Sequence, residues 1–232
     1  MSIEAASGWP AGIAVLVPVY NHVATVAAVV AACRGLGAPF ILVVDDGSTD
    51  GSGQRAGGDR LITLTRNRGK GQALETGLGH LAEAGWRQVL TIDADLQHPP
   101  AEGLRLALAA SREPSALWVG ARVMPHAPLA SRAGRWVTGA CSWAACGRWP
   151  LDNQTGLRVW PLPAMTALSI RARRYAFEPE SLVRAVRAGV ALRELPVAVE
   201  YPKDRISHFG MLRDTIRTAA VMGRLLIDRR AV

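Results

Sequence analysis

Two carboxylates end an apolar segment in the stretch TIDADLQHPP, residues 91–100. Asp93 and Asp95 stand one residue apart and are followed by Gln97 and a Pro-Pro pair. Like charges at this spacing repel and cost stability unless a cation, hydrogen bonds or water relieve them. Mg²⁺ and Mn²⁺ take oxygen ligands and complete their shells with water and substrate phosphates. We therefore predict a divalent-metal site at Asp93, Asp95 and Gln97. The alternative is that Asp93 caps a helix and Asp95 is solvated.

Short apolar segments alternate with helical segments through the first half of the chain. Strands are expected at 13–19, 40–46, 61–67, 87–95 and 115–122, with helices at 23–37, 69–85 and 100–111. This pattern predicts an α/β fold with a mostly parallel central sheet flanked by helices. In the second half we expect helices at 129–149, 177–189 and 209–230, with short strands at about 156–161 and 190–201.

Ligands of an open parallel sheet bind at the carboxyl ends of its strands. Asp45 and Asp46 follow the second expected strand, and Asp93 and Asp95 end the fourth. We therefore expect these four carboxylates at one edge of the sheet. If the strand continues through residue 95, side-chain alternation directs Asp93 and Asp95 the same way.

Composition limits the class of protein. The chain has 232 residues, 49% of them hydrophobic, and a formal net charge of +8, which favours anionic partners. Its three cysteines, Cys33, Cys141 and Cys146, match no zinc spacing and predict reduced cytosolic thiols. We expect no signal peptide and no transmembrane helix.

Three other classes of protein lack their expected features. A dinucleotide-dependent dehydrogenase needs a G-x-G-x-x-G turn after the first strand, where the chain has PVYNHV. A sugar-nucleotide pyrophosphorylase needs a Gly-rich basic loop at the same place. A nucleic-acid-binding module would show a recognisable motif, and acidic strand ends repel phosphate without a metal. We expect no nucleic-acid partner.

Four motifs occur in order: VPVYN, VVDDGSTDGS, RNRGKGQAL and DADLQHPP. Together they resemble the family 2 glycosyltransferases of GT-A fold, most closely the polyprenyl-phosphate (dolichol-phosphate) mannose and glucose synthases. The resemblance covers roughly residues 12–210. It implies metal-dependent, inverting transfer of a hexose from a UDP or GDP donor to a polyprenyl phosphate or another membrane-proximal lipid. The alternatives are a hydroxyl acceptor, or a donor-binding homologue without turnover.

The resemblance also implies roles for individual residues. The donor would contact Pro18, Val19, Tyr20, His22, Asp45, Asp46, Lys70, Asp93, Ala94, Asp95 and Arg122. His22 stands where the family usually has Glu, which leaves the donor base open. Lys70 either contacts phosphate at a helix start or is a solvated residue of a turn.

The segment DNQTGLRVWP resembles a family motif and places Asp152, Thr155, Gly156 and Arg158 beside the acceptor. A hydroxyl acceptor needs a general base, whereas an ionised phosphate needs only cations to hold it. The candidate catalytic residues are Asp95, Arg122, Asp152 and Glu180, with Glu178 as a further candidate base. The candidate phosphate-binding residues are Arg132, Arg135, Lys203, Arg205 and His208, the last standing where Lys is common.

The segment 209–230 forms an amphipathic pattern at helical spacing. Arg213, Arg217 and Arg224 form one stripe, and Met211, Leu212, Ala219, Met222 and Leu226 lie broadly opposite. Such a helix can lie on an anionic membrane, pack its apolar side on the domain, or support a homodimer. Trp136, Trp143 and Trp149 suit the headgroup zone of a membrane.

We therefore expect a single domain over residues 1–232. Residues 10–122 would form its donor half, 123–208 its acceptor half and 209–230 an amphipathic helix. The protein would be cytoplasmic and could bind peripherally to the cytoplasmic face of the inner membrane.

Overall fold

The computed structural model describes residues 8–123, 129–172, 174–200 and 211–227; at 129–135, 211–217 and 219 it describes the path of the chain only. The described residues form a seven-stranded sheet in the order β3-β2-β1-β4-β6-β5-β7. Its strands are β1 (Ile13–Val19), β2 (Ile41–Asp45), β3 (Arg60–Thr63), β4 (Gln88–Thr91), β5 (Leu117–Arg122), β6 (Arg158–Pro161) and β7 (Leu192–Val197). Only β6 runs antiparallel to its neighbours, β4 and β5. The predicted α/β class with a mostly parallel sheet is confirmed.

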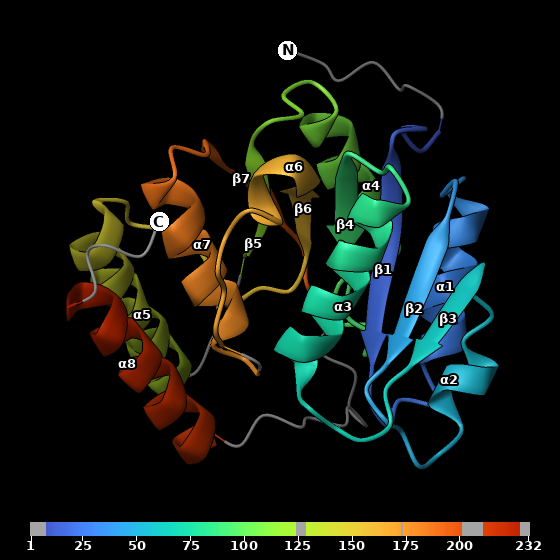
Figure 1. Ribbon diagram of the computed structural model, residues 1–232, viewed down its shortest axis with the longest axis horizontal. Helices are drawn as coiled ribbons and strands as arrows, with labels where there is room; N and C mark the ends of the chain where they lie inside the picture. Colours follow the sequence, from blue (N-terminus) through green and yellow to red (C-terminus); the bar gives the residue numbers. More distant parts are fainter. Residues whose placement is uncertain (1–7, 124–128, 173, 201–210, 228–232) are drawn as a thin grey trace.

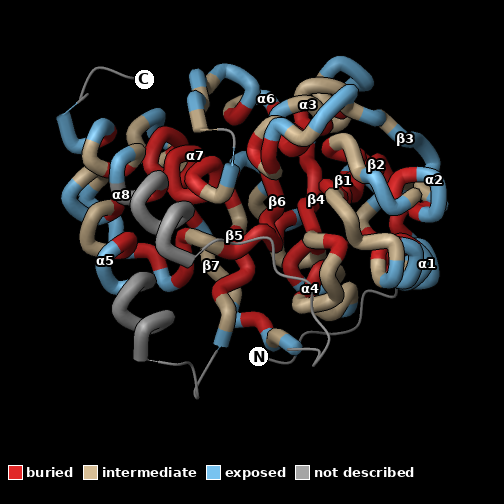
Figure 2. The backbone as a smooth tube through the Cα atoms, turned by 90° about the horizontal axis from the view of Figure 1, so that it is seen from below, coloured by how far each residue is buried: buried red, intermediate tan, exposed pale blue. Residues whose placement is uncertain are grey.

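Helices cover both faces of the sheet (Figure 1). One face packs against α1 (Val26–Gly35) and α4 (Pro100–Ala110). The other packs against α3 (Lys70–Glu83), α6 (Leu162–Met165) and α7 (Phe177–Arg187). Both faces of β1 are therefore apolar, with Val15 and Val17 on one side and Ala14 and Leu16 on the other. Figure 2 shows this buried core along the central strands. The four-residue helices α2 (Ser52–Arg55) and α6 were not predicted.

The register brings strand ends to one edge. Val19 at the end of β1 pairs with Asp45 at the end of β2. Thr91, the last residue of β4, pairs with Leu16 of β1. The chain after β4 therefore continues beside the last residues of β1. The N–H of Ile92 donates to the Leu16 carbonyl at 3.1 Å and continues this contact. The acidic residues after β2 and β4 therefore meet at the carboxyl edge.

The last two long helices, α5 (Leu129–Cys146) and α8 (Met211–Ile227), pack beside α7 at one end of the molecule (Figure 1). Met222 and Leu225 of α8 are buried in a small cluster with Val183 of α7. On the predicted apolar side of α8, Met222 is therefore buried against the domain, whereas Leu226 is 37% exposed. Packing on the domain, one of the three predicted options, holds for this part of the helix. Within the described residues, no helix has both the length and the apolar content required to span a bilayer.

Candidate functional site

Asp93 and Asp95 lie in a turn rather than in a strand. β4 ends at Thr91, so the predicted strand through residue 95 was wrong, and strand alternation does not orient the two carboxylates. Asp95 Oδ1 accepts the N–H of Gln97 at 3.0 Å, and Leu96 between them has a φ of 61°. The N-cap of α4 is Pro99, so Asp93 does not cap that helix. The turn places both carboxylates at the edge where the strands end.

Lys70 forms the cationic centre of this edge. Its Nζ lies 2.7 Å from Asp93 Oδ1 and 2.8 Å from Glu178 Oε1. The Glu178 side chain, at the start of α7, is only 2% exposed. Burial opposes a charged lysine, but the carboxylates of Asp93 and Glu178 outweigh it and raise the pKa of Lys70 well above its usual value. The interpretation of Lys70 as a solvated turn residue was wrong.

The neighbouring glycine explains how the ammonium and the carboxylate approach each other. A Cβ at Gly156 would lie 2.5 Å from both Lys70 Nζ and Asp93 Oδ2. Any side chain at residue 156 would therefore displace the ion pair. The resemblance placed Gly156 beside the acceptor, and the structure places it against the Lys70–Asp93 pair.

The negative charge of Asp95 is less well balanced than that of Asp93, which pairs with Lys70. Burial, and then the charge of Asp93, raise the pKa of Asp95 to about 6. A divalent cation would relieve this strain, and a carboxylate oxygen is a ligand that Mg²⁺ and Mn²⁺ prefer. The residues therefore fit a cation held by Asp95, with substrate oxygens and water completing its shell. Asp93 already has the Lys70 ammonium as a partner. Among the described residues, no group of three or more His, Cys, Asp or Glu side chains forms a complete protein cage.

Arg122, at the end of β5, forms a bidentate ion pair with Asp152. Its Nε lies 2.6 Å from Oδ2, and its Nη2 lies 3.0 Å from Oδ1. Asp152 also accepts the N–H of Gln154 at 3.0 Å. Burial alone would raise the pKa of Asp152, but Arg122 lowers it below its usual value. Asp152 is thus a weak base that orients Arg122.

Glu180 is likewise occupied. Its Oε1 lies 2.7 Å from Arg184 Nε, and its Oε2 accepts the N–H of Ala172 at 2.7 Å. The fully buried Arg158 donates to the carbonyls of Thr155, Glu178 and Asn153, which ties the 152–156 loop to α7. The three candidate bases, Asp152, Glu178 and Glu180, therefore all have cationic partners.

The carboxylates after β2 hold loops together. Asp46 accepts the N–H groups of Arg68 and Gly69 at 2.8 and 2.7 Å, and its own N–H donates to the Val19 carbonyl. Asp45 is buried and accepts the N–H of Ser48 at 2.8 Å. Both acids shape the carboxyl edge through backbone contacts.

The remaining predicted donor residues lie along the same edge. The N–H of His22 donates to Ser52 Oγ at 2.8 Å, and the Ala94 carbonyl accepts from Thr25 Oγ1 at 2.6 Å. Pro18 is buried at the end of β1, and Tyr20 beyond it is partly buried. The turn after β1 is therefore anchored by backbone groups.

One buried residue of the site was not predicted. His98 Nε2 lies 3.2 Å from Thr155 Oγ1, and burial lowers the pKa of His98 to about 4. Its ring is therefore neutral at pH 7 beside the two charged pairs. Its place in the DADLQHPP motif was the available signal. The predicted phosphate-binding residues Lys203, Arg205 and His208 lie outside the described residues, as do the side chains of Arg132 and Arg135.

Comparison with known proteins identifies relatives of this chain. Residues 14–161 match the family model "Glycosyl transferase family 2". An uncharacterised protein of Methanocaldococcus jannaschii is 28% identical over 202 residues, which cover 83% of each chain. The UDP-N-acetylglucosamine–dolichyl-phosphate N-acetylglucosaminyltransferase of Methanococcus voltae is 25% identical over 86% of this chain and 88% of its own. An undecaprenyl-phosphate 4-deoxy-4-formamido-L-arabinose transferase of Edwardsiella ictaluri is 35% identical over 43% of this chain and 34% of its own.

Solved structures share the fold at lower sequence identity. Glucosyl-3-phosphoglycerate synthase of Mycobacterium tuberculosis, crystallised with Mn²⁺, UDP and glucosyl-3-phosphoglycerate, superposes with a TM-score of 0.73 at 21% identity. The match covers 94% of this chain and 85% of that one. Mannosyl-3-phosphoglycerate synthase of Rubrobacter xylanophilus gives 0.70 at 19% identity, over 94% and 73% of the two chains.

Proposed function

The chain belongs to glycosyl transferase family 2, and from this premise we propose that it transfers a hexose, with inversion, from a nucleotide-sugar donor to a polyprenyl phosphate. Its membership confirms the resemblance seen in the four motifs and makes the protein a glycosyltransferase. Relatives named for dolichyl-phosphate and undecaprenyl-phosphate acceptors support a lipid phosphate as the acceptor. The UDP in a structural neighbour supports UDP, with GDP as the alternative. We assign residues 10–122 to the donor half and 123–208 to the acceptor half of one domain.

One observation carries the choice of acceptor. The three candidate general bases are all in ion pairs: Asp152 with Arg122, Glu178 with Lys70 and Glu180 with Arg184. A carboxylate that takes a proton from an acceptor hydroxyl would give up its cationic partner. In all three pairs the carboxylate side chain is almost fully buried, so an unpaired partner would be costly. A phosphate acceptor is already ionised and asks for no base.

The carboxyl edge suits the departure of a nucleoside diphosphate. A Mg²⁺ or Mn²⁺ ion held by Asp95 would neutralise charge on the leaving diphosphate. Lys70 keeps Asp93 ionised and fixed beside Asp95, and Asp152 holds the Arg122 guanidinium at the same edge. The acceptor phosphate attacks C1 of the sugar from the face opposite the diphosphate, which inverts that centre.

A membrane surface is the expected location of a lipid acceptor. Trp136, Trp143 and Leu151 are 64%, 58% and 65% exposed near the end of the molecule formed by α5 and α8. Large apolar side chains at this exposure fit the headgroup zone of a bilayer. We propose peripheral binding at the cytoplasmic face of the inner membrane through this surface. The buried Met222 and Leu225 of α8 are occupied in packing and do not contribute.

The test compares two acceptors that differ in one group. Purified protein receives a UDP- or GDP-hexose, Mn²⁺ and either a short polyprenyl phosphate or the corresponding polyprenol. Product that forms with the polyprenyl phosphate but not with the polyprenol supports the proposal. Equal product with the alcohol contradicts it and favours a hydroxyl acceptor, which requires a general base. If neither the UDP-hexose nor the GDP-hexose is consumed, with or without acceptor, the protein is the homologue without turnover that His22 suggests.

A further inference from the structure

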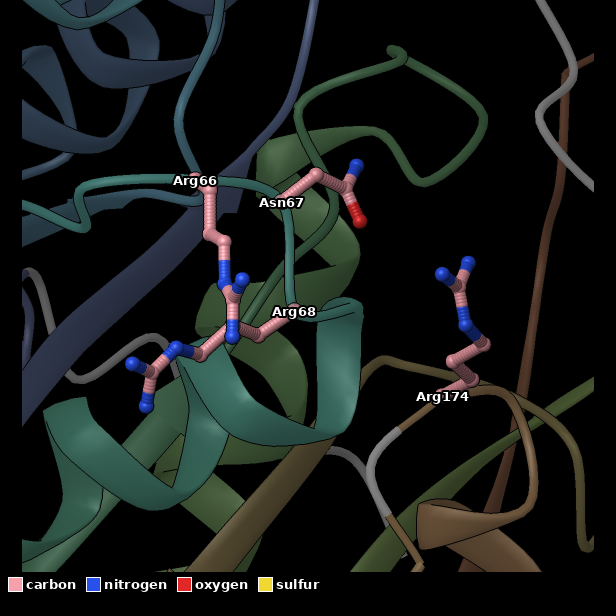
Figure 3. Close-up of a pocket in the computed structure, with 4 residues that line it drawn as sticks. All are labelled: Arg66, Asn67, Arg68 and Arg174. Atoms are coloured by element: carbon pink, nitrogen blue, oxygen red, sulfur yellow. The ribbon is translucent and has the colours of Figure 1, made fainter.

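Three arginines from two distant segments line one pocket of about 550 Å³ (Figure 3). Arg66, Asn67 and Arg68 lie in the loop between β3 and α3, and Arg174 lies in the loop between α6 and α7. Figure 3 shows Arg174 across the pocket from Arg66 and Arg68, with the Asn67 side chain extending towards it. The three arginines are exposed, and no carboxylate of the described residues pairs with them. The pocket therefore concentrates positive charge.

The wall that carries Arg66 and Arg68 is fixed to the sheet. The Asp46 carboxylate accepts the N–H groups of Arg68 and Gly69. A Cβ at Gly47 would lie 2.6 Å from the carbonyl carbon of Arg66, so the two backbones are in close contact. Gly47 has a φ of 74°, which a glycine adopts without strain. The loop is therefore held in place before any ligand binds, which reduces the entropy lost on binding.

The opposite wall is electrostatically linked to the same carboxylate. Burial raises the pKa of Asp46, and the charge of Arg174 acts in the opposite direction. Arg174 thus acts electrostatically on the acid that directly follows β2. Lys70 follows this loop by two residues and bridges Asp93 and Glu178. The pocket therefore borders the edge where the nucleotide donor is proposed to bind.

We propose that Arg66, Asn67, Arg68 and Arg174 form a phosphate-binding pocket for a substrate of the glycosyl transfer. A guanidinium keeps its charge at all working pH values and binds phosphate oxygens in pairs. Three of them, none in an ion pair with a carboxylate of the described residues, make an anion site. This inference rests on the proposed function, which supplies two phosphate-bearing substrates, the nucleotide donor and the lipid phosphate.

Asn67 distinguishes between the two substrates. Its Oδ1 is buried and has no hydrogen-bond donor among the described residues. A ligand that fills the pocket completely would bring both a phosphate and a hydrogen-bond donor. A nucleotide offers both, because its ribose hydroxyls and its base lie near its phosphates. A polyprenyl phosphate has only a hydrocarbon chain beside its phosphate, and this chain offers no hydrogen-bond donor. The nucleotide donor is therefore the favoured source of the phosphate.

The test measures binding by titration calorimetry, with Mn²⁺ and again with EDTA. The ligands are UDP, GDP, uridine, guanosine, inorganic pyrophosphate and a short polyprenyl phosphate. The proteins are the wild type, Arg174→Ala, the double variant Arg66→Ala/Arg68→Ala, and Arg112→Ala as an exposed arginine outside the pocket. All substituted side chains are exposed, so melting temperatures should remain close to that of the wild type.

We expect both pocket variants to weaken the preferred nucleoside diphosphate by about tenfold or more, since each loses a charge-assisted contact. Nucleoside binding should change by less than about twofold, because a nucleoside has no phosphate for the pocket to hold. Arg112→Ala should match the wild type. If the variants weaken polyprenyl phosphate instead, the pocket holds phosphate but its source is the acceptor.

Two further outcomes separate this inference from the proposed function. In the first, the wild type binds UDP or GDP, and the pocket variants bind the nucleoside diphosphate and the polyprenyl phosphate as tightly as the wild type does. The phosphate-binding pocket is then overturned, and the donor function stands. If the wild type binds no nucleoside diphosphate even with Mn²⁺, the donor function fails. Pyrophosphate binding then decides whether the pocket binds anions. Pyrophosphate binding that is lost in the variants retains the anion pocket. Absent or unchanged pyrophosphate binding overturns it.

Discussion

The Lys70 ammonium lies 2.7 Å from Oδ1 of Asp93, so the first carboxylate of the acidic pair already has a cation within the protein. The second, Asp95, has a hydrogen bond from a backbone N–H and a raised pKa of about 6. The two acids of the motif are therefore not equivalent. Asp93 is a fixed, ionised neighbour, and Asp95 is the carboxylate that gains most from a bound cation.

Replacement of Lys70 by Met should destabilise the protein by about 3 kcal/mol at pH 7. The change leaves the carboxylates of Asp93 and Glu178 without their shared counter-charge, and breaking a pair of this kind is costly. Urea denaturation measures the loss. Because Lys70 holds the pKa of Asp93 low, the deficit should shrink as the pH falls and the variant's carboxylates take up protons.

An exposed ion pair provides the control for Lys70. Arg34 pairs with Asp59 at 3.0 Å, with side chains 47% and 31% exposed. Arg34→Met should cost less than about 1 kcal/mol. A Lys70→Met variant no less stable than Arg34→Met at pH 7 would contradict a structural role for the buried pair.

Gly156→Ala should disrupt the site with a single methyl group. The new Cβ would lie 2.5 Å from Lys70 Nζ and Asp93 Oδ2, so the ion pair must move. We expect transferase activity to fall by about tenfold or more, since small displacements of positioning groups are expensive. Gly79→Ala in α3 is the matched control, because nothing lies within 4 Å of its added Cβ. It should leave activity unchanged and raise the melting temperature slightly. Equal activity in both variants would rule out the Gly156 contact.

Asp95 should give the protein a pH-dependent stability that Asp95→Asn removes. Its pKa is about 6 in the folded state and 3.8 ordinarily, so ionising it opposes folding. Relative to the variant, the wild type should lose about 2.5 kcal/mol between pH 4 and pH 7. Mn²⁺ should restore wild-type stability at pH 7 but not at pH 4.5, where protons compete for Asp95. Denaturation at four pH values, with and without Mn²⁺, measures this. A constant difference between the two proteins would refute it.

The sequence predicts the parallel part of the sheet because its strands are apolar on both faces. The four motifs likewise locate Asp45, Asp46, Asp93 and Asp95 at one edge, since parallel strands end together. The antiparallel β6 is harder to foresee. It is a four-residue strand inserted between β4 and β5, and its orientation depends on the path of a long connection.

The pairings within the site could not be predicted, because they join residues far apart in the chain. Lys70 meets Glu178 across 108 positions, and Arg122 meets Asp152 across 30. A solvated Lys70 and a basic Asp152 are reasonable expectations for each residue taken alone. Only the fold shows that each charge has a partner, and that the partner changes its chemistry.

Asp152→Asn should lower activity without changing the shape of the pH profile. Asn keeps an oxygen for the Gln154 N–H but loses the charge that holds Arg122. We expect kcat/KM for the lipid phosphate to fall by about tenfold, as one charge-assisted contact is weakened. If Asp152 were the general base, the acidic limb of the pH profile would disappear in the variant and activity would be nearly abolished. Initial rates from pH 5 to pH 9 distinguish the two roles.

The double variant Trp136→Gln/Trp143→Gln should bind membranes more weakly. Both indoles are more than half exposed on α5, and inserting a large apolar side chain is worth about 1.5–3 kcal/mol. Sedimentation with anionic liposomes should therefore show binding reduced by about tenfold or more. Leu61→Gln is the control, since Leu61 is 40% exposed on β3, the edge strand at the opposite end of the sheet from β7. Binding should also weaken as salt is added, because basic residues contribute to it. Liposome binding that is equal in all three proteins, or absent from the wild type at low salt, would place the membrane contact elsewhere or remove it.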